Sequence, residues 1–448
     1  MRVLILDVEA PNMLDLAMRA SAAGHEVRWW RWTANPNLLD GKGFKGFEII
    51  QEWQPSMPWA RDGLIIATSN KRHIHNLDRY REMGYKIFGP TIASAKLEVD
   101  RGAGMDLIRS IGHELPPYTQ FNSLEEAEAF ARKSDRAWVH KPMGDEDDKS
   151  LTYVSRDQAD MCGWLRRQIK RGKKLKGPCL LQEKIDKLSE VGVSGWMGPE
   201  GFLRDKWQVC FEHKPLMNDN VGPATGEQGT VMQYTDNDKL AEEMLMPLEP
   251  ALRALGHTGD FAVGAMIDTK GNAHFLEFTA RMGYPAFWIQ IASHRGDPVK
   301  WMRDLLDSKD TLKVSYDVAI GVVMTQPLYP FADSNSDSMS PKDLIEGSPI
   351  HGVEGVLKDV HLVSAMIDKG PILEDGKVVD RPIYATTGEY VLVATGLGKT
   401  VQKARKRVYD VVDQIHVSDC MYRTDIGAAL EKELGPLHKA GYAKDVIW

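Results

Sequence analysis

The stretch GAMIDTKGNAHFLEFTARMG, residues 264–283, decides the fold of this chain. Its two apolar halves flank the polar turn DTKGN, a pattern that predicts a β-hairpin. Asp268 ends the first strand, Glu277 lies on the second, and Arg281 follows it directly. Magnesium binds carboxylate oxygens beside phosphates, and an arginine can neutralise a phosphate during its transfer. We therefore predict that Glu277 and Asp268 bind Mg²⁺, or Mn²⁺ in its place, with Arg281 beside them.

Two segments upstream of this hairpin carry groups suited to a nucleotide. Lys141 ends an apolar strand, where an ammonium can hold phosphate oxygens, and Lys149 lies in a glycine-containing loop that can cover them. The strand LLQEKI at 180–185 suits backbone contacts with a purine edge, and Glu190 can accept hydrogen bonds from ribose hydroxyls. Taken singly, each feature is also typical of an ordinary surface position. Together with the hairpin, they predict a site for a nucleoside triphosphate.

The composition is typical of a soluble globular protein. The chain has 448 residues, 43% hydrophobic and 27% charged, which predicts about two to four domains. The formal charge of −7 argues against a protein that coats nucleic-acid backbones. Apolar runs such as residues 318–324 are too short to cross a bilayer, and the four cysteines lack the spacing of a zinc site. We expect a cytoplasmic protein without membrane contact.

The order of the predicted elements indicates a multidomain chain of the α/β and α+β classes. Residues 3–30 show a β-α-β pattern, which favours a parallel sheet covered by helices. Closely spaced strand patterns between 180 and 234 favour antiparallel pairing. Helical patterns predict helices at 94–111 and 238–255, and the polar segment 333–340 predicts a solvated loop.

Several motifs, in order over most of the chain, resemble those of the ATP-grasp ligases, and within them the glycinamide ribonucleotide synthetase family. The first of these motifs is the helical stretch GPTIASAKLEVDRGAGMDLIRS, which begins at Gly89. The others, in order, are LQEKID at 181–186, EHKP at 212–215, GPATGEQG at 222–229, the hairpin quoted above, VLVATGLGKTVQKARKRVYDVVDQIH at 391–416 and DCMYRTDIG at 419–427. The last two are similar to the final domain of that synthetase family. The resemblance therefore includes the subfamily.

The resemblance implies an ATP-grasp fold with three parts. These are an α/β N-terminal domain on the acceptor side at 1–92, an ATP-grasp core at 93–325 and a small mixed C-terminal domain at 326–448. A mobile lid is expected at about 118–182 within the core. Such lids exclude water from a reactive acyl phosphate.

The resemblance also implies an activity and roles for individual residues. ATP would phosphorylate a carboxylate to an acyl phosphate, which an amine attacks to give an amide. ATP would be bound by Arg101, Lys141 and Lys149 at its phosphates, by Glu183 and Ile185 at adenine, and by Glu190 at ribose, with Glu277 on the metal. The amino acid would be bracketed by His213, Lys214 and Arg281, the expected catalytic residues, and by the loop residues Gly222, Thr225, Gly226 and Gly229.

Three departures separate this chain from the family pattern. The family's glycine-rich turn after the first strand, which cradles the phosphate of phosphoribosylamine, reads Asp7-Val8-Glu9-Ala10-Pro11-Asn12, where carboxylates would repel a phosphate. The small cover loop is replaced by the acidic segment Gly144–Lys149. Thr279 replaces an asparagine metal ligand and Tyr284 replaces an acidic residue.

Three hypotheses follow. The leading one is a ligase that couples glycine or another small amino acid to a divergent amine, such as that of a nucleotide or modified nucleobase. The second is the authentic synthetase of purine biosynthesis, with the phosphate of phosphoribosylamine held by Lys71 and Arg72. The third is a non-catalytic ATP-binding homologue.

The expected partners are small molecules. The basic run from Arg166 to Lys176 is typical of a solvated helix end, and its alternative role is to guide a nucleotide or nucleic-acid acceptor. A monomer or a homodimer is expected.

Overall fold

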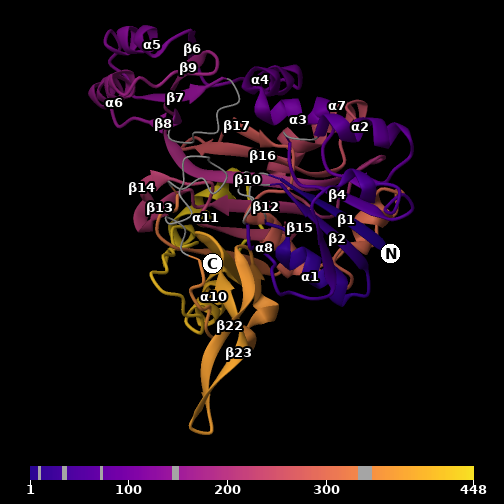
Figure 1. Ribbon diagram of the computed structural model, residues 1–448. Helices are drawn as coiled ribbons and strands as arrows, with labels where there is room; N and C mark the ends of the chain where they lie inside the picture. The colour runs from indigo at the N-terminus through magenta and orange to yellow at the C-terminus, as the bar shows by residue number, and fades with distance from the viewer. Residues whose placement is uncertain (9–11, 33–37, 71–73, 144–150, 331–345) are drawn as a thin grey trace.

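The computed structural model of the protein describes residues 1–8, 12–32, 38–70, 74–143, 151–330 and 346–448. Figure 1 shows a large central sheet, a small lid above it and a parallel α/β unit beside it. Among the described residues, no helix is long and apolar enough to span a membrane.

The chain begins with a five-stranded parallel sheet in the order β3-β2-β1-β4-β5. The central strand is buried from Val3 to Leu6, because helices cover both faces of a parallel sheet. The predicted β-α-β opening is confirmed, and the strand order reverses between β1 and β4, where open α/β sheets bind ligands. The elements are β1 (Arg2–Asp7), α1 (Leu14–Ala22), β2 (Glu26–Arg31), β3 (Phe47–Ile50), η1 (Gln54–Ser56), β4 (Leu64–Ala67), α2 (Ile74–Glu82) and β5 (Ile87–Phe88).

Two short helices lead from this unit to the lid. The predicted single helix at 94–111 is wrong, because Asp100 has an extended backbone and ends α3 (Ile92–Val99). The Asp100 side chain then accepts a hydrogen bond from the Ala103 amide and caps α4 (Arg101–Ser110). The break places Arg101 at the start of a new helix.

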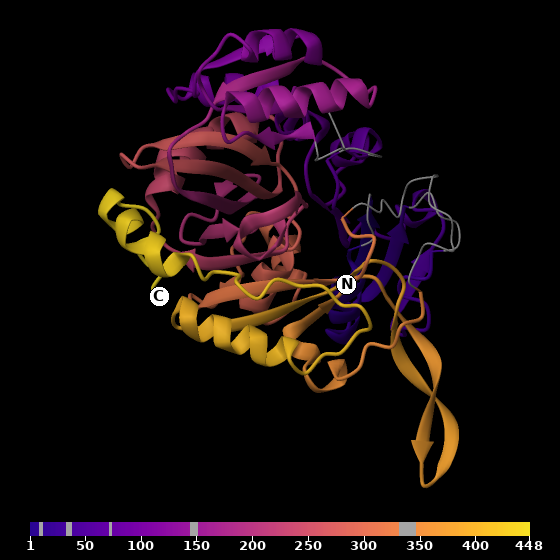
Figure 2. The same cartoon turned by 90° about the vertical axis from the view of Figure 1, so that its left-hand side faces the viewer.

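The lid is a four-stranded antiparallel sheet in the order β6-β9-β7-β8 with two helices on it. It lies above the edge of the central sheet in both ribbon views (Figures 1 and 2). Ser123 and Asp157 cap its helices by accepting hydrogen bonds from the Glu126 and Asp160 amides. Its elements are β6 (Tyr118–Phe121), α5 (Leu124–Ala131), β7 (Trp138–Pro142), β8 (Tyr153–Val154), α6 (Gln158–Lys170) and β9 (Cys179–Glu183).

The central sheet runs in the order β17-β16-β10-β12-β15-β20-β24-β21, with β11 paired to β10. Its neighbouring strands are antiparallel, as predicted for residues 180–234. The strands are β10 (Lys187–Gly198), β11 (Gly201–Phe202), β12 (Trp207–Glu212), β15 (Gly229–Thr235), β16 (Gly259–Asp268), β17 (Ala273–Thr279), β20 (Val318–Thr325), β21 (Val360–Leu362) and β24 (Tyr390–Gly398). The domain division at residues 92 and 325 stays a prediction. Strand β20, which ends at Thr325, pairs with β24 from the predicted C-terminal domain.

The predicted continuous helix at 238–255 is also wrong. Pro247 and Pro250 lack the amide hydrogen that a helix interior needs, and the segment divides into a π-helical turn η4 (Ala241–Leu245), η5 (Met246–Leu248) and α7 (Glu249–Ala254). The other elements are β13 (Pro215–Met217), η3 (Asn218–Asn220), β14 (Val221–Ala224), α8 (Ala286–Ser293), β18 (His294–Arg295), α9 (Lys300–Leu305), β19 (Lys313–Val314), η7 (Val353–Gly355), η8 (Leu357–Asp359), α10 (Val401–Val412) and α11 (Leu430–Ala440).

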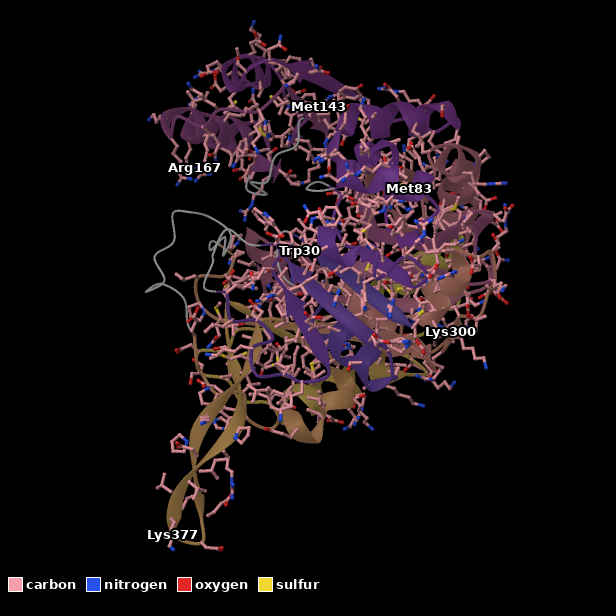
Figure 3. All side chains as sticks on the ribbon, turned by 45° about the vertical axis from the view of Figure 1, so that its right-hand side comes forward. Trp30, Met83, Met143, Arg167, Lys300 and Lys377 are labelled. Atoms are coloured by element: carbon pink, nitrogen blue, oxygen red, sulfur yellow. The ribbon has the colours of Figure 1, made fainter. Side chains whose placement is uncertain are left out.

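A two-stranded hairpin projects from the body of the protein. Strands β22 (Ala365–Glu374) and β23 (Lys377–Thr386) pair along their whole length. Figure 2 shows the hairpin extending into solvent, and Figure 3 labels Lys377 at its tip, far from Met143 beside the lid. Because the lid lies at the other end of the molecule (Figures 1 and 2), the hairpin tip takes no part in the site described below.

Candidate nucleotide and substrate site

The centre of the candidate site is the ammonium group of Lys214, which follows β12. Its Nζ donates to Glu190 Oε1 at 2.9 Å and to Glu277 Oε1 at 3.1 Å. It also forms an ion pair with Glu212 Oε2 at 3.1 Å. One cation therefore joins carboxylates from three strands of the central sheet.

Strand register explains why these carboxylates meet. Gly264 on β16 lies opposite Gly192 on β10 and opposite Glu277 on β17. Gly192 also lies opposite Cys210 on β12. Because residues two apart share a face of a strand, Glu190 and Glu212 project to the same side of the sheet as Glu277.

The charges in this cluster stabilise one another. Burial opposes the charge on Lys214, but Glu212, Glu277 and Glu190 outweigh it and raise the pKa of Lys214 well above its ordinary value. Burial would raise the pKa of Glu190, but the Lys214 ammonium outweighs that effect and lowers it. The site therefore keeps a positive charge amid ionised carboxylates at neutral pH.

Lys141 and Arg101 bring positive charge from the lid side. Lys141 is on β7, where burial lowers its pKa to about 7 and Arg101 adds to the lowering, while Glu277 opposes it. Arg101 donates through Nε to the Pro142 carbonyl at 3.0 Å and through Nη1 to the Leu276 carbonyl at 3.3 Å. Arg101 thus ties the end of a lid strand to the strand that carries Glu277. A bound phosphate would favour the charged form of Lys141.

Arg281 lies just beyond β17 and is held by Glu98. The guanidinium forms an ion pair with Glu98 Oε1 at 3.2 Å and donates to the Met282 carbonyl at 3.1 Å. The second oxygen of Glu98 accepts from the Ala280 amide at 2.7 Å. Glu98 therefore fixes Arg281 close to the end of the strand that carries Glu277.

The predicted amino-acid loop lies against His213 and Lys214. The Thr225 amide donates to the Lys214 carbonyl at 3.0 Å, and the Gln228 amide donates to the His213 carbonyl at 2.8 Å. Gly222 has φ 93°, and this left-handed conformation lets the loop turn. These contacts bring residues 222–229 beside the Lys214 cluster.

His213 stabilises this arrangement as a neutral ring. Its Nε2 accepts from the Gly427 amide at 3.0 Å, which ties β12 to the C-terminal part of the chain. Burial lowers its pKa to about 4, and the charge of Arg423 acts in the same direction. His213 is therefore uncharged near neutral pH, and its ring contacts the C-terminal part of the chain while its carbonyl contacts the loop.

The structure does not bring Asp268 to Glu277. Asp268 lies four residues beyond the β16 partner of Glu277, about 13 Å along the strand. Its Oδ1 accepts from the Lys270 and Asn272 amides, and its Oδ2 is 2.9 Å from His274 Nε2. Both oxygens of Asp268 serve the hairpin turn.

The predicted adenine contacts lie at the junction of the lid and the central sheet. The Glu183 amide donates to the Pro117 carbonyl at 2.8 Å, and its carboxylate pairs with Arg136. Ile185 lies in the loop between β9 and β10. Lys149 and the acidic cover segment lie outside the described residues.

Glu277 would hold a magnesium ion, although the described residues contain no group of three or more His, Cys, Asp or Glu side chains placed to bind a metal together. Glu277 supplies hard carboxylate oxygens and its side chain is 48% exposed, so a ligand can reach it. Thr279 follows it by two residues on β17 and can supply a hydroxyl on the same face.

Two site residues were not assigned from the sequence, although both stand in quoted motifs. Glu212 begins EHKP, and Glu227 is the acidic residue of GPATGEQG. A carboxylate between glycines of a substrate loop was the available signal for Glu227. The sequence contains no pattern that indicates a role for Glu212, because only the strand register brings its carboxylate to Lys214.

Asp7 at the end of β1 binds the backbone at the start of α1. Asp7 Oδ2 accepts from the Met13 amide at 2.8 Å and from the Trp29 indole at 3.1 Å. Burial raises the pKa of Asp7 to about 7, and the hydrogen bond from Met13 opposes this rise. The Asp7 carboxyl thus uses a backbone donor just before α1, the place where a helix N-terminus attracts an anion. Glu9, Ala10 and Pro11 lie outside the described residues, as do Lys71 and Arg72.

Replacing Lys214 by Met should destabilise the protein more at pH 8 than at pH 4.5. Without the ammonium, the three ionised carboxylates repel one another, and protonation at low pH relieves that repulsion. The expected loss at pH 8 is about 1 to 3 kcal/mol, at the lower end because the side chains are partly exposed. Thermal denaturation across this pH range measures it.

Lys206→Met is the control, because Lys206 is a buried lysine that pairs with two aspartates, Asp205 and Asp310, away from this site. Its deficit should depend less on pH, because the Asp205 side chain is 62% exposed. A Lys214→Met deficit of the same size at both pH values would contradict the electrostatic account.

Comparison with known proteins agrees with this architecture. The family model described as phosphoribosylglycinamide synthetase, C domain, matches residues 319–429. The phosphoribosylamine–glycine ligase of Escherichia coli K12 is 28% identical over 374 residues, covering 80% of this chain and 81% of that protein.

Solved structures share the fold. The phosphoribosylamine–glycine ligase of Thermotoga maritima superimposes with a TM-score of 0.66 at 18% identity, over 95% of this chain and 100% of that one. The biotin carboxylase of Campylobacter jejuni, in a complex with an ATP ligand, has a TM-score of 0.58 at 13% identity, over 99% and 96%. The chain therefore shares the fold of these solved structures and is similar in sequence to the phosphoribosylamine–glycine ligases.

Proposed function

We propose that this protein is an ADP-forming ligase that joins the carboxylate of a small amino acid to an amine. The observation that carries the proposal is the Lys214 cluster with Glu190 and Glu277, which faces Lys141 and Arg101 of the lid side. The names of the relatives, phosphoribosylamine–glycine ligases, support the same reaction type.

The proposed reaction has two steps, phosphoryl transfer to the carboxylate and attack by the amine. A carboxylate oxygen of the amino acid attacks the γ-phosphorus of ATP, an acyl phosphate forms and ADP leaves. The amine nitrogen of the acceptor then attacks the acyl carbon, phosphate leaves, and the nitrogen loses a proton. Lys141 and Arg101 would hold the phosphates, Arg281 would hold the carboxylate, and Glu190 would accept from the ribose. Magnesium bound at Glu277 would offset negative charge on the phosphates.

Glu277→Gln should lower ADP formation by at least about 100-fold while ATP still binds. The amide retains the shape of the side chain but supplies one weak neutral ligand in place of a carboxylate. Steady-state ADP release with MgATP and the twenty common amino acids, each with an added amine, measures the effect. Glu433→Gln is the control, because Glu433 is a partly buried carboxylate on α11 that accepts from Ser189, on β10 beside Glu190.

Removing magnesium with a chelator should abolish turnover by the unaltered protein. Undiminished ADP formation by Glu277→Gln would show that the metal lies elsewhere. If the unaltered protein binds ATP but forms no ADP with any amine and amino acid, the non-catalytic hypothesis replaces this one.

For the acceptor, we propose an amine without a phosphate at the N-terminal turn. Asp7 supports this proposal, because its carboxyl already accepts from the Met13 amide where an anion would bind. Asp40, a second buried carboxyl in this region, acts on Asp7 electrostatically and adds to the raising of its pKa. A nucleoside-like or nucleobase amine meets these groups without the repulsion that a phosphate would meet.

The alternative acceptor is phosphoribosylamine, and the relatives' names favour it. In that case another group must hold the phosphate. Lys71 and Arg72, the residues expected to do so, lie outside the described residues. In either case the proposed partners are two small molecules, an amino acid and an amine. We also propose a cytoplasmic location and an assembly that is a monomer or a homodimer.

At pH 8.5, above the raised pKa of Asp7, Asp7→Asn should lower the apparent KM for phosphoribosylamine by about 10-fold while leaving that for unphosphorylated ribosylamine within about 2-fold. Neutralising the side chain removes repulsion from a phosphate but does not affect a neutral sugar. ADP release against each amine, at saturating MgATP and amino acid, gives both values. Glu26→Gln, at the opposite end of the same sheet, is the matched control.

The unaltered protein should prefer ribosylamine to phosphoribosylamine. A low KM for phosphoribosylamine that Asp7→Asn leaves unchanged would contradict the proposed acceptor, although the ligase reaction would stand.

A further inference from the structure

Glu227 lies between two strands beside the Lys214 cluster, and the proposed reaction has not used it. Its side chain is buried, with 6% of the residue exposed. Its Oε1 accepts no hydrogen bond from the part of the chain that the structure describes. The backbone is fixed on both sides, by Thr225 on the Lys214 carbonyl and by Gln228 on the His213 carbonyl. The carboxyl is therefore held in place without a partner for this oxygen.

Other buried polar atoms that lack a partner in the described part of the chain belong to residues that contact the loop or act electrostatically on Glu227. Within the described residues, the Tyr390 hydroxyl and His213 Nδ1 are buried and make no hydrogen bond. Glu227 acts electrostatically on Tyr390 and on Tyr329, whose rings lie 5.9 Å apart. Buried polar atoms in native proteins nearly always have partners. The buried Glu227 oxygen, which has no partner among the described residues, therefore indicates a position for a polar ligand.

The charge at this position favours a cation. Burial raises the pKa of Glu227 well above its ordinary value, and the nearby charge of Glu212 adds to the effect. Lys214 and Arg281 oppose this shift but do not cancel it. A bound cation would stabilise the ionised carboxylate, whereas an anion would meet repulsion.

Arg281 is the second charged group near Glu227 that the proposed reaction uses. It is close enough to Glu227 to act on its ionisation, and Glu98 holds it near the end of β17. A carboxyl and a guanidinium near each other match the two charges of a zwitterion. An amino acid carries its carboxylate and ammonium on one carbon atom, so it can reach both groups at once.

We propose that Glu227 binds the ammonium group of the amino acid whose carboxylate is activated, and that it thereby selects amino acids over carboxylic acids that lack an ammonium. The Tyr329 and Tyr390 hydroxyls complete the polar wall around that group. This inference rests on the proposed ligase reaction, and it names the substrate class of the same site. Glu227 holds the substrate and takes no part in the phosphoryl or acyl transfer.

Hydroxylamine provides a test that does not require the natural acceptor, because it converts an acyl phosphate to a hydroxamate that can be measured by colour. The unaltered protein is supplied with MgATP, hydroxylamine and each of the twenty common amino acids, and with acetate and propionate, which match glycine and alanine without the ammonium. We expect hydroxamate from at least one amino acid and at least about 10-fold less from acetate and propionate.

Glu227→Gln should raise the KM for the preferred amino acid about 10- to 100-fold, the range for a lost charge-assisted hydrogen bond, while kcat changes little. Glu227→Asp keeps the charge and should recover part of the affinity. Asp238→Asn is the control, because Asp238 is a buried carboxyl that accepts from the Leu240 and Ala241 amides away from this site. ATP affinity, measured separately by calorimetry, should be unchanged in all three variants and shows that they are folded.

If Glu227→Gln keeps the KM of the unaltered protein, or if acetate and propionate react as well as glycine and alanine, the inference is overturned while the ligase reaction stands. If no carboxylate gives hydroxamate with the unaltered protein, the proposed function fails and the inference fails with it.

Discussion

The interaction on which the site depends is the contact of one ammonium group, that of Lys214, with three carboxylates. Glu190, Glu212 and Glu277 would repel one another on a single sheet face, and the central cation makes their arrangement stable. The same cluster fixes Glu277 opposite the lid-side cations Lys141 and Arg101. Negative and positive groups thus face each other across the position where a metal–nucleotide complex would lie. This separation of charge depends on the antiparallel register of β12, β10, β16 and β17.

Two buried carboxyl groups distinguish this protein within that general scheme. Asp7 accepts from the Met13 amide at the start of α1, and so occupies one backbone donor that an anion would need. Glu227 places a carboxyl beside the substrate loop, where the proposed ligand carries a positive charge. Both effects are local. They affect the charge of the substrate that the proposed site would bind, and they do not affect the proposed nucleotide site or the fold.

Much of the fold could be predicted from the sequence, because apolar periodicity marks β1 to β2 and the hairpin around Asp268. The site was less accessible. The hairpin pattern placed Glu277 correctly on β17. It could not show that Asp268 accepts hydrogen bonds within its own turn, because an aspartate suits a turn and a metal site equally well. Glu212 meets Lys214 only through strand pairing, which periodicity does not specify. The helix breaks at Asp100 and Pro247 were visible as local signals, but a continuous apolar pattern outweighed them.

The most direct test of the central claim is exchange of labelled oxygen within ATP, without any amine acceptor. ATP carrying isotopically labelled oxygen in the β–γ bridge is incubated with magnesium, the protein and amino acids, and the label position is followed by phosphorus NMR. Reversible acyl phosphate formation lets the β-phosphate of ADP rotate, so the account predicts that the label moves to non-bridging positions only when an amino acid is present. Movement that is independent of any carboxylate, or a fixed label with every amino acid while ATP binds, would contradict it.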